Sequence, residues 1–173
     1  NNGYLRGSLV RPLSADSAGR GAVGDGVEVA VPVNYPCQVG VQQGDVEARW
    51  LYGVLTAGAK EYPMELKNQS LSSGSQCLGI NARPIPQVRL ALPEYWTLPF
   101  GRGWLQLKGH LAYGMTTDDG WQHDFTKRQT KYCDHMLYHS KAGFLRIGNE
   151  NAFCPLSIEM GLEMVAQFGG NAY

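Results

Sequence analysis

Residues 156–168 read LSIEMGLEMVAQF and alternate between two kinds of side chain. Every even position is apolar, and every odd position is polar or glycine apart from Val165. A period of two belongs to an extended strand, because successive side chains of a strand point to opposite faces. A helix would spread these apolar residues around its axis. The segment is also long enough for a tilted strand to cross a bilayer, which takes roughly 9–11 residues.

A second segment, residues 104–115, alternates as cleanly. Leu105, Leu107 and Leu111 share one face, and Lys108 and His110 lie on the other. Shorter alternating runs bring the expected strands to eight, with connections at 11–26, 57–86 and 116–141, a turn at Gly44-Asp45 and no helix. The expected strands are 4–10, 27–33, 39–41, 46–56, 87–92, 104–115, 143–148 and 156–168.

The composition narrows the class of protein. The chain has 173 residues, enough for one domain, and a formal net charge of zero, which argues against binding nucleic acid by bulk charge. Charged residues make up 17%, below the ~25% of typical soluble domains, and glycine is abundant at 22 residues. No apolar run reaches the ~18 residues of a transmembrane helix. Low charge with many glycines and aromatic residues fits a membrane barrel better than an average cytosolic domain.

The four cysteines and four histidines give no metal-binding pattern. Cys37, Cys77, Cys133 and Cys154 form no CxxC pair, so two disulfides and four free thiols both stay open. The histidines form no HxH or HExxH motif, so we expect no metal and no cofactor. The chain begins without methionine, which indicates a removed leader or a start inside a longer protein.

Alternation by itself fits two architectures. A soluble β-sandwich packs its apolar faces together, whereas a transmembrane barrel turns them to lipid and its charges to the lumen. Strand length favours the barrel. Aromatic residues near the expected strand ends, where membrane interfaces lie, favour it too: Tyr95, Trp96, Phe100, Trp104 and Trp121.

Three groups of short strings, from about residue 50 onward, resemble the Wzi-type capsule assembly family of outer-membrane β-barrels in its Bacteroides-like form. The first group is LSSGS at 71–75 with NARPIPQV at 81–88. The second is GWLQLKG at 103–109 with LAYG at 111–114 and DDGWQ at 118–122. The third is YHSK at 138–141, FLRIGN at 144–149, GLEM at 161–164 and QFGG at 167–170.

This resemblance implies an all-β, antiparallel transmembrane β-barrel. It also implies a non-enzymatic lectin in the bacterial outer membrane that assembles or attaches capsule or exopolysaccharide. Its partners would be surface polysaccharide, outer-membrane lipid and other outer-membrane proteins, without nucleic acid. Family members are several hundred residues long, so we expect residues 1–173 to form a single barrel region of a larger barrel.

Seven residues are candidates for binding polysaccharide, because sugars stack on aromatic faces and donate hydroxyl hydrogen bonds to carboxylates. The alternatives are an ordinary acidic loop with Trp121 as an interfacial anchor, and lumen charges that only pair with one another. The candidates are Asp118, Asp119, Trp121 and His123 in a loop, and Lys108, His110 and Arg146 on the polar strand face.

Two other functions remain open at this point. The first is a secreted β-sandwich that binds carbohydrate, with the same apolar faces packed in a core. The second is a membrane-embedded hydrolase, for which the adjacent pair His139-Ser140 is the candidate. No GxSxG nucleophile motif supports a hydrolase, so we expect no catalytic residue.

Overall fold

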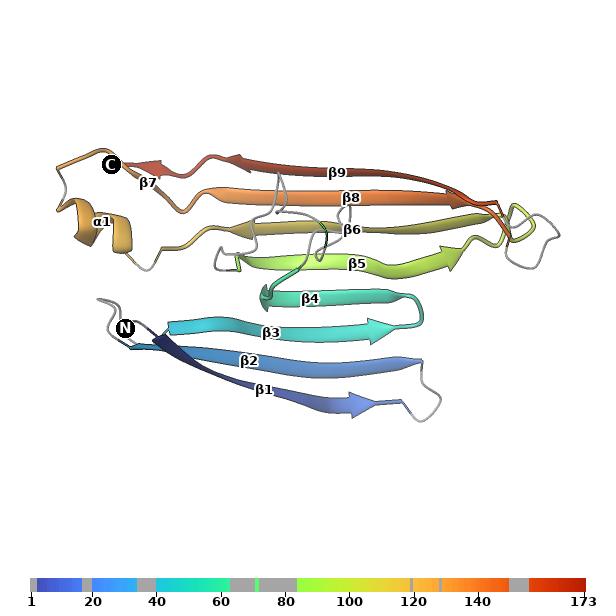
Figure 1. The fold of residues 1–173 in the computed structure, drawn as a ribbon, viewed down its shortest axis with the longest axis horizontal. Coiled ribbons are helices and arrows are strands. Elements are labelled where there is room, and N and C mark those ends of the chain that lie inside the picture. Colours follow the sequence, from blue (N-terminus) through green and yellow to red (C-terminus); the bar gives the residue numbers. More distant parts are fainter. Residues whose placement is uncertain are drawn as a thin grey trace.

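A large antiparallel sheet dominates the computed structural model, which describes residues 3–16, 20–33, 40–62, 71, 84–118, 120–127, 129–149 and 156–173. Eight strands pair in the order β1-β2-β3-β4-β5-β6-β8-β9 (Figure 1). The sheet is not closed, since β1 and β9 form its two edges. Its strands are β1 Gly3–Ala15, β2 Gly21–Val33, β3 Gly40–Trp50, β4 Gly53–Ala59, β5 Pro86–Thr97, β6 Leu105–Met115, β8 Leu137–Ile147 and β9 Ile158–Phe168.

Connections of different length gather at the two ends of the sheet. At one end the linkers are 16–20, 51–52, 98–104 and 148–157, and at the other they are 34–39, 60–85 and 116–136. The two longest linkers therefore leave from the same end, which we call the long-loop end. It carries the short helix α1 (Trp121–Thr126) and a ribbon of β7 (Cys133–Asp134) with β10 (Asn171–Ala172), beyond the tips of the long strands (Figure 1).

The pairing register separates the side chains into two faces. Lys108 lies opposite Phe144, and Arg146 lies opposite both Gln106 and Glu159. These residues belong to a charged face that continues across the sheet. It includes Arg6, Glu28, Asp45, Glu47, Arg49, Arg89, Lys108, His110, Arg146, Glu159 and Glu163.

The opposite surface is the apolar face, and most of its large side chains are exposed. Leu9 on β1 is 70% exposed and Leu162 on β9 is 65% exposed. Charged exceptions on this face include Arg11, Asp25 and Lys141. Its apolar members include Leu5, Leu9, Val27, Val46, Leu55, Val88, Leu90, Leu111, Met160, Leu162 and Met164.

Burial is reversed relative to a soluble sheet. Within the described residues, every buried side chain lies on the charged face, beside the ion pairs. A soluble protein instead buries its apolar face and leaves its charges in water. The buried side chains are Val54, Thr56, Ala91, Ala112, Tyr138, Ser140 and Phe144.

The prediction of one strand over 46–56 is wrong. The chain reverses between β3 and β4 at Leu51 and Tyr52, where Leu51 adopts a φ of 44°. The predicted turn at Gly44-Asp45 is also wrong, because both residues pair inside β3 with Gly58 and Ala59 of β4. A separate short strand was expected over 39–41, but Gly40 and Val41 are the first residues of β3. Val39 lies outside the described residues.

Two predicted connections are shorter than expected. The segment 11–26 lies largely within β1 and β2, and the 116–141 connection ends at residue 136 because β8 begins at Leu137. The expectation of no helix is wrong as well, since α1 forms over six residues. In the described part of the chain, no helix is long and apolar enough to cross a membrane.

Candidate functional site

Cross-braces hold the loop that joins β6 to β8. Thr116 and Met136 exchange hydrogen bonds where the loop begins and ends, with the Thr116 N–H donating to the Met136 carbonyl at 2.8 Å. Gln122 of α1 donates from Nε2 to the Cys133 carbonyl at 2.9 Å, which ties the helix to β7. Tyr132 and Tyr173 exchange backbone hydrogen bonds of 3.2 and 3.0 Å beside the β7–β10 pair. The described residues of 116–136 and 169–173 are therefore tied together by hydrogen bonds, and we call them the loop-end cap.

A hollow of about 690 Å³ opens in this cap between α1 and the β7–β10 ribbon. Its size falls within the roughly 300–1,000 Å³ typical of small-molecule sites. The lining combines carboxylates, an ammonium, an amide, hydroxyls and aromatic rings. The lining residues are Asp118, Gly120, His123, Gln129, Thr130, Lys131, Tyr132, Asp134 and Tyr173.

The cap contains two pairs of stacked aromatic rings. The rings of Tyr132 and Tyr173 stack with centroids 5.2 Å apart inside the hollow, and the Tyr173 side of that stack is 62% exposed. Trp121 and Phe125, one turn apart on α1, stack with centroids 4.9 Å apart and an interplanar angle of 12°. These rings are 59% and 71% exposed and do not line the hollow.

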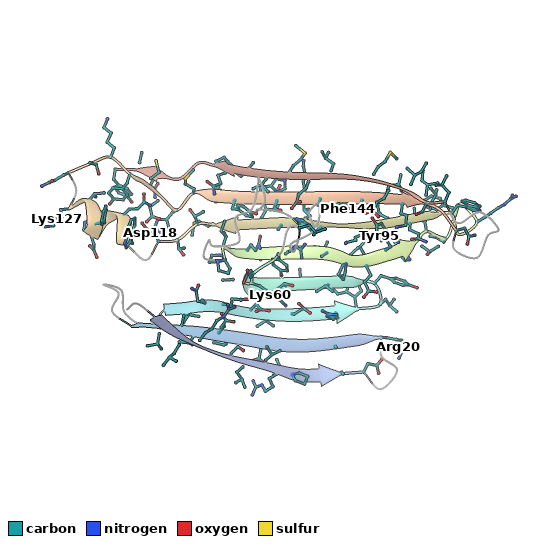
Figure 2. The ribbon with its side chains drawn as sticks, viewed as in Figure 1. Arg20, Lys60, Tyr95, Asp118, Lys127 and Phe144 are labelled. Carbon is teal, nitrogen blue, oxygen red and sulfur yellow. The ribbon has the colours of Figure 1, made fainter. Side chains whose placement is uncertain are left out.

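Asp118 has a structural role at the start of α1. Its Oδ1 accepts the Gly120 N–H and its Oδ2 accepts the Gln122 N–H, both at 2.9 Å. Desolvation of the carboxylate favours its neutral form, but these amide hydrogen bonds outweigh it and hold the pKa of Asp118 below its ordinary value. Asp118 therefore stays ionised near neutral pH and orders the helix that forms one wall of the hollow. Figure 2 shows Asp118 beside α1.

Lys108 and Arg146 lie toward the other end of the sheet, on the charged face. The Arg146 guanidinium lies 3.8 Å from the Tyr95 ring centroid and 3.2 Å from the Glu159 carboxylate. The Lys108 ammonium is 5.7 Å from the Tyr95 ring and 5.5 Å from the Phe144 ring. Figure 2 places Tyr95 and Phe144 far from Asp118. Arg146 is thus paired with other side chains of the charged face.

His110 pairs with Ser140 near the middle of the charged face. His110 Nε2 and Ser140 Oγ are 2.8 Å apart, and Ser140 is 3% exposed. His139 points to the apolar face instead, where its Nδ1 bonds the Ala112 carbonyl and its ring stacks on Tyr113. The adjacent residues His139 and Ser140 therefore do not form the pair that their sequence suggested.

The seven predicted ligand residues thus fall into separate places. Asp118 and His123 line the hollow, Trp121 lies outside it, and Lys108, His110 and Arg146 lie along the sheet. Sequence reasoning missed Tyr132, Asp134 and Tyr173, which meet the hollow only because β10 turns back onto β7. The adjacent glycines Gly169 and Gly170 were the sequence signal for this turn. Asp119, Cys37, Cys77 and Cys154 lie outside the described residues.

Cys133 is the one cysteine among the described residues. Cys133 is exposed and free. The described histidines, cysteines and acidic residues include no group of three arranged to hold a metal ion.

No family model matches the chain, and no curated protein or solved structure matches it significantly.

Proposed function

We propose that this chain forms part of the wall of a transmembrane β-barrel in the bacterial outer membrane. In this proposal it attaches or organises capsule or exopolysaccharide at the cell surface and catalyses no reaction. The reversed burial carries the proposal: the buried side chains share one face of the sheet with ion pairs such as Arg49–Glu47 and Arg146–Glu159, and exposed leucine, valine and methionine dominate the other. A barrel wall between lipid and a polar lumen requires that distribution.

Three further features agree with a membrane wall. Seven of the eight strands have 11–13 residues, enough to cross a bilayer at a tilt. Longer loops leave from one end of the sheet, as in bacterial barrels. Aromatic residues gather at the opposite end, where a membrane interface would lie: Trp50, Tyr52, Trp96, Phe100 and Trp104.

A soluble sandwich explains the same faces less well. It would cover the apolar face with a second sheet, packed about 10 Å away. The second sheet found in the described residues is the two-stranded β7–β10 ribbon, which lies beyond the ends of the strands (Figure 1).

Two neighbouring substitutions test the membrane wall. Leu9 and Ser8 are adjacent and exposed on β1 but lie on opposite faces. We expect Leu9→Arg to reduce insertion into lipid vesicles strongly, and Ser8→Arg, opposite Glu28, to insert like the original chain. Equal insertion of the two variants, or a protein that stays monomeric in water without detergent, would overturn the proposal.

A cell-based experiment tests the polysaccharide function. Deleting the gene should release surface polysaccharide into the medium while the total amount synthesised stays constant. Restoring the chain should return the polysaccharide to the cell surface. An unchanged distribution in the deletion strain would contradict this part of the proposal.

A further inference from the structure

We infer that the hollow in the loop-end cap is a binding site for uncharged or amino sugars and excludes uronic-acid sugars. The inference names the site and sugar class of the proposed function, and it rests on that function only for the source of the glycan.

The order of the cap is the first support. If this connection of 21 residues were unstructured, a ligand would have to order it, and the lost conformational entropy would weaken binding. Here Gln122 fastens α1 to β7, and the Tyr132–Tyr173 backbone exchange fastens the chain after β9 to the same unit. The walls of the hollow are thus held in place before any ligand enters.

The chemistry of the lining is the second support. The exposed ring of Tyr173 offers an aromatic surface to the apolar C–H face of a pyranose, and Gln129 and Thr130 offer both donors and acceptors to its hydroxyls. An aromatic surface bordered by polar side chains that both donate and accept hydrogen bonds suits a polyhydroxylated ring.

The charge of the residues that line the hollow indicates which class of sugar it binds. The lining carries two carboxylates, Asp118 and Asp134, against the single ammonium of Lys131, so its formal charge is −1 with His123 neutral. Asp118 keeps that charge near neutral pH because two backbone amides bind it. A uronic acid would meet net repulsion here, whereas a neutral sugar would not and an amino sugar would gain attraction.

Binding to a printed panel of bacterial oligosaccharides, sorted into neutral, amino and uronic-acid sets, tests the inference. The full chain is applied in detergent. We expect signals from the neutral or amino sets, and we expect Tyr173→Ala to weaken them about tenfold, the loss of one stacking surface. Tyr173→Phe should retain them, which separates loss of the ring from unfolding of the ribbon. Phe125→Ala, an exposed ring of the same cap outside the hollow, should bind like the original chain.

Three outcomes would overturn the inference: binding to the uronic-acid set that equals or exceeds binding to the other two sets, binding lost in Phe125→Ala but kept in Tyr173→Ala, or no binding to any set. None of them depends on membrane insertion, which the Leu9 and Ser8 variants report separately. Failure of the sugar site and failure of the membrane wall are therefore distinguishable.

Discussion

Arg11 and Asp25 lie directly opposite each other on β1 and β2, with Nε 3.2 Å from Oδ1, on the largely apolar face of the sheet. The environment of this pair decides its energetic weight. An exposed ion pair in water contributes about 0–1 kcal/mol, whereas an unpaired arginine facing lipid costs up to about 2–4 kcal/mol.

Asp25→Leu should therefore lower the free energy of unfolding by about 2–4 kcal/mol in lipid, because it leaves Arg11 without its carboxylate. The double variant Arg11→Leu/Asp25→Leu should recover most of that loss, because it removes both charges. Urea unfolding in vesicles measures the cycle. If all three proteins unfold within about 0.5 kcal/mol of one another, the pair lies in water and the membrane wall is contradicted.

Gly109 and Gly143 face each other across β6 and β8 but differ in the space around them. A Cβ added at Gly109 would lie 2.4 Å from the Ala142 carbonyl oxygen, whereas one added at Gly143 meets nothing within 4 Å. We expect Gly109→Ala to destabilise the sheet by about 1–3 kcal/mol and Gly143→Ala to be close to neutral. Denaturant midpoints of the two variants check this asymmetry, and equal midpoints would contradict the β6–β8 register.

Strands with uninterrupted alternation were predictable from the sequence. Residues 156–168 contain β9 and residues 104–115 contain β6, because a period of two survives wherever one face is apolar and the other polar. The β3–β4 turn was not predictable in this way. Alternation runs straight through Trp50 and Tyr52, and Leu51 takes a positive φ that leucine rarely adopts.

The candidate site was predictable only in part. Asp118 and His123 stood out as a polar cluster, but α1 is too short to show helical periodicity. The residues that complete the hollow, such as Tyr173, come from a distant segment and are brought there by β10. Alternation also does not tell which face is buried, and that distinction came from the exposures of the two faces.

Asp118 should make the order of α1 depend on pH. Its pKa is lowered in the folded chain, so the stabilisation is fully present above the ordinary carboxyl pKa and is lost as the pH falls through the lowered value. Hydrogen exchange of the Gly120 and Gln122 amides, followed from about pH 5 down to about pH 2, should show protection falling only at the acid end. If protection is already lost near pH 5, the ionised Asp118 carboxylate is not what orders α1.

Removing the Asp118 carboxylate should have the same local effect at neutral pH. Asp118→Ala should lower the local stability of α1 by about 0.5–2 kcal/mol, the range for lost helix caps, and leave exchange in β6 unchanged. Asp124→Ala is a matched control, because Asp124 lies on the same helix and bonds the neighbouring His123 side chain instead of the backbone amides at the helix start. Equal exchange in the two variants would show that Asp118 does not order the helix.

Ser140 and His110 should act as a structural pair without turnover. Their 2.8 Å contact resembles a nucleophile and its base, but Ser140 is almost completely buried on the charged face. We expect Ser140→Ala to cost about 0.5–1.5 kcal/mol, the net value of one hydrogen bond. The original chain should hydrolyse p-nitrophenyl esters no faster than buffer and should not react with a fluorophosphonate. Turnover that disappears in Ser140→Ala and His110→Gln, and persists in His139→Gln on the opposite face, would instead establish a hydrolase.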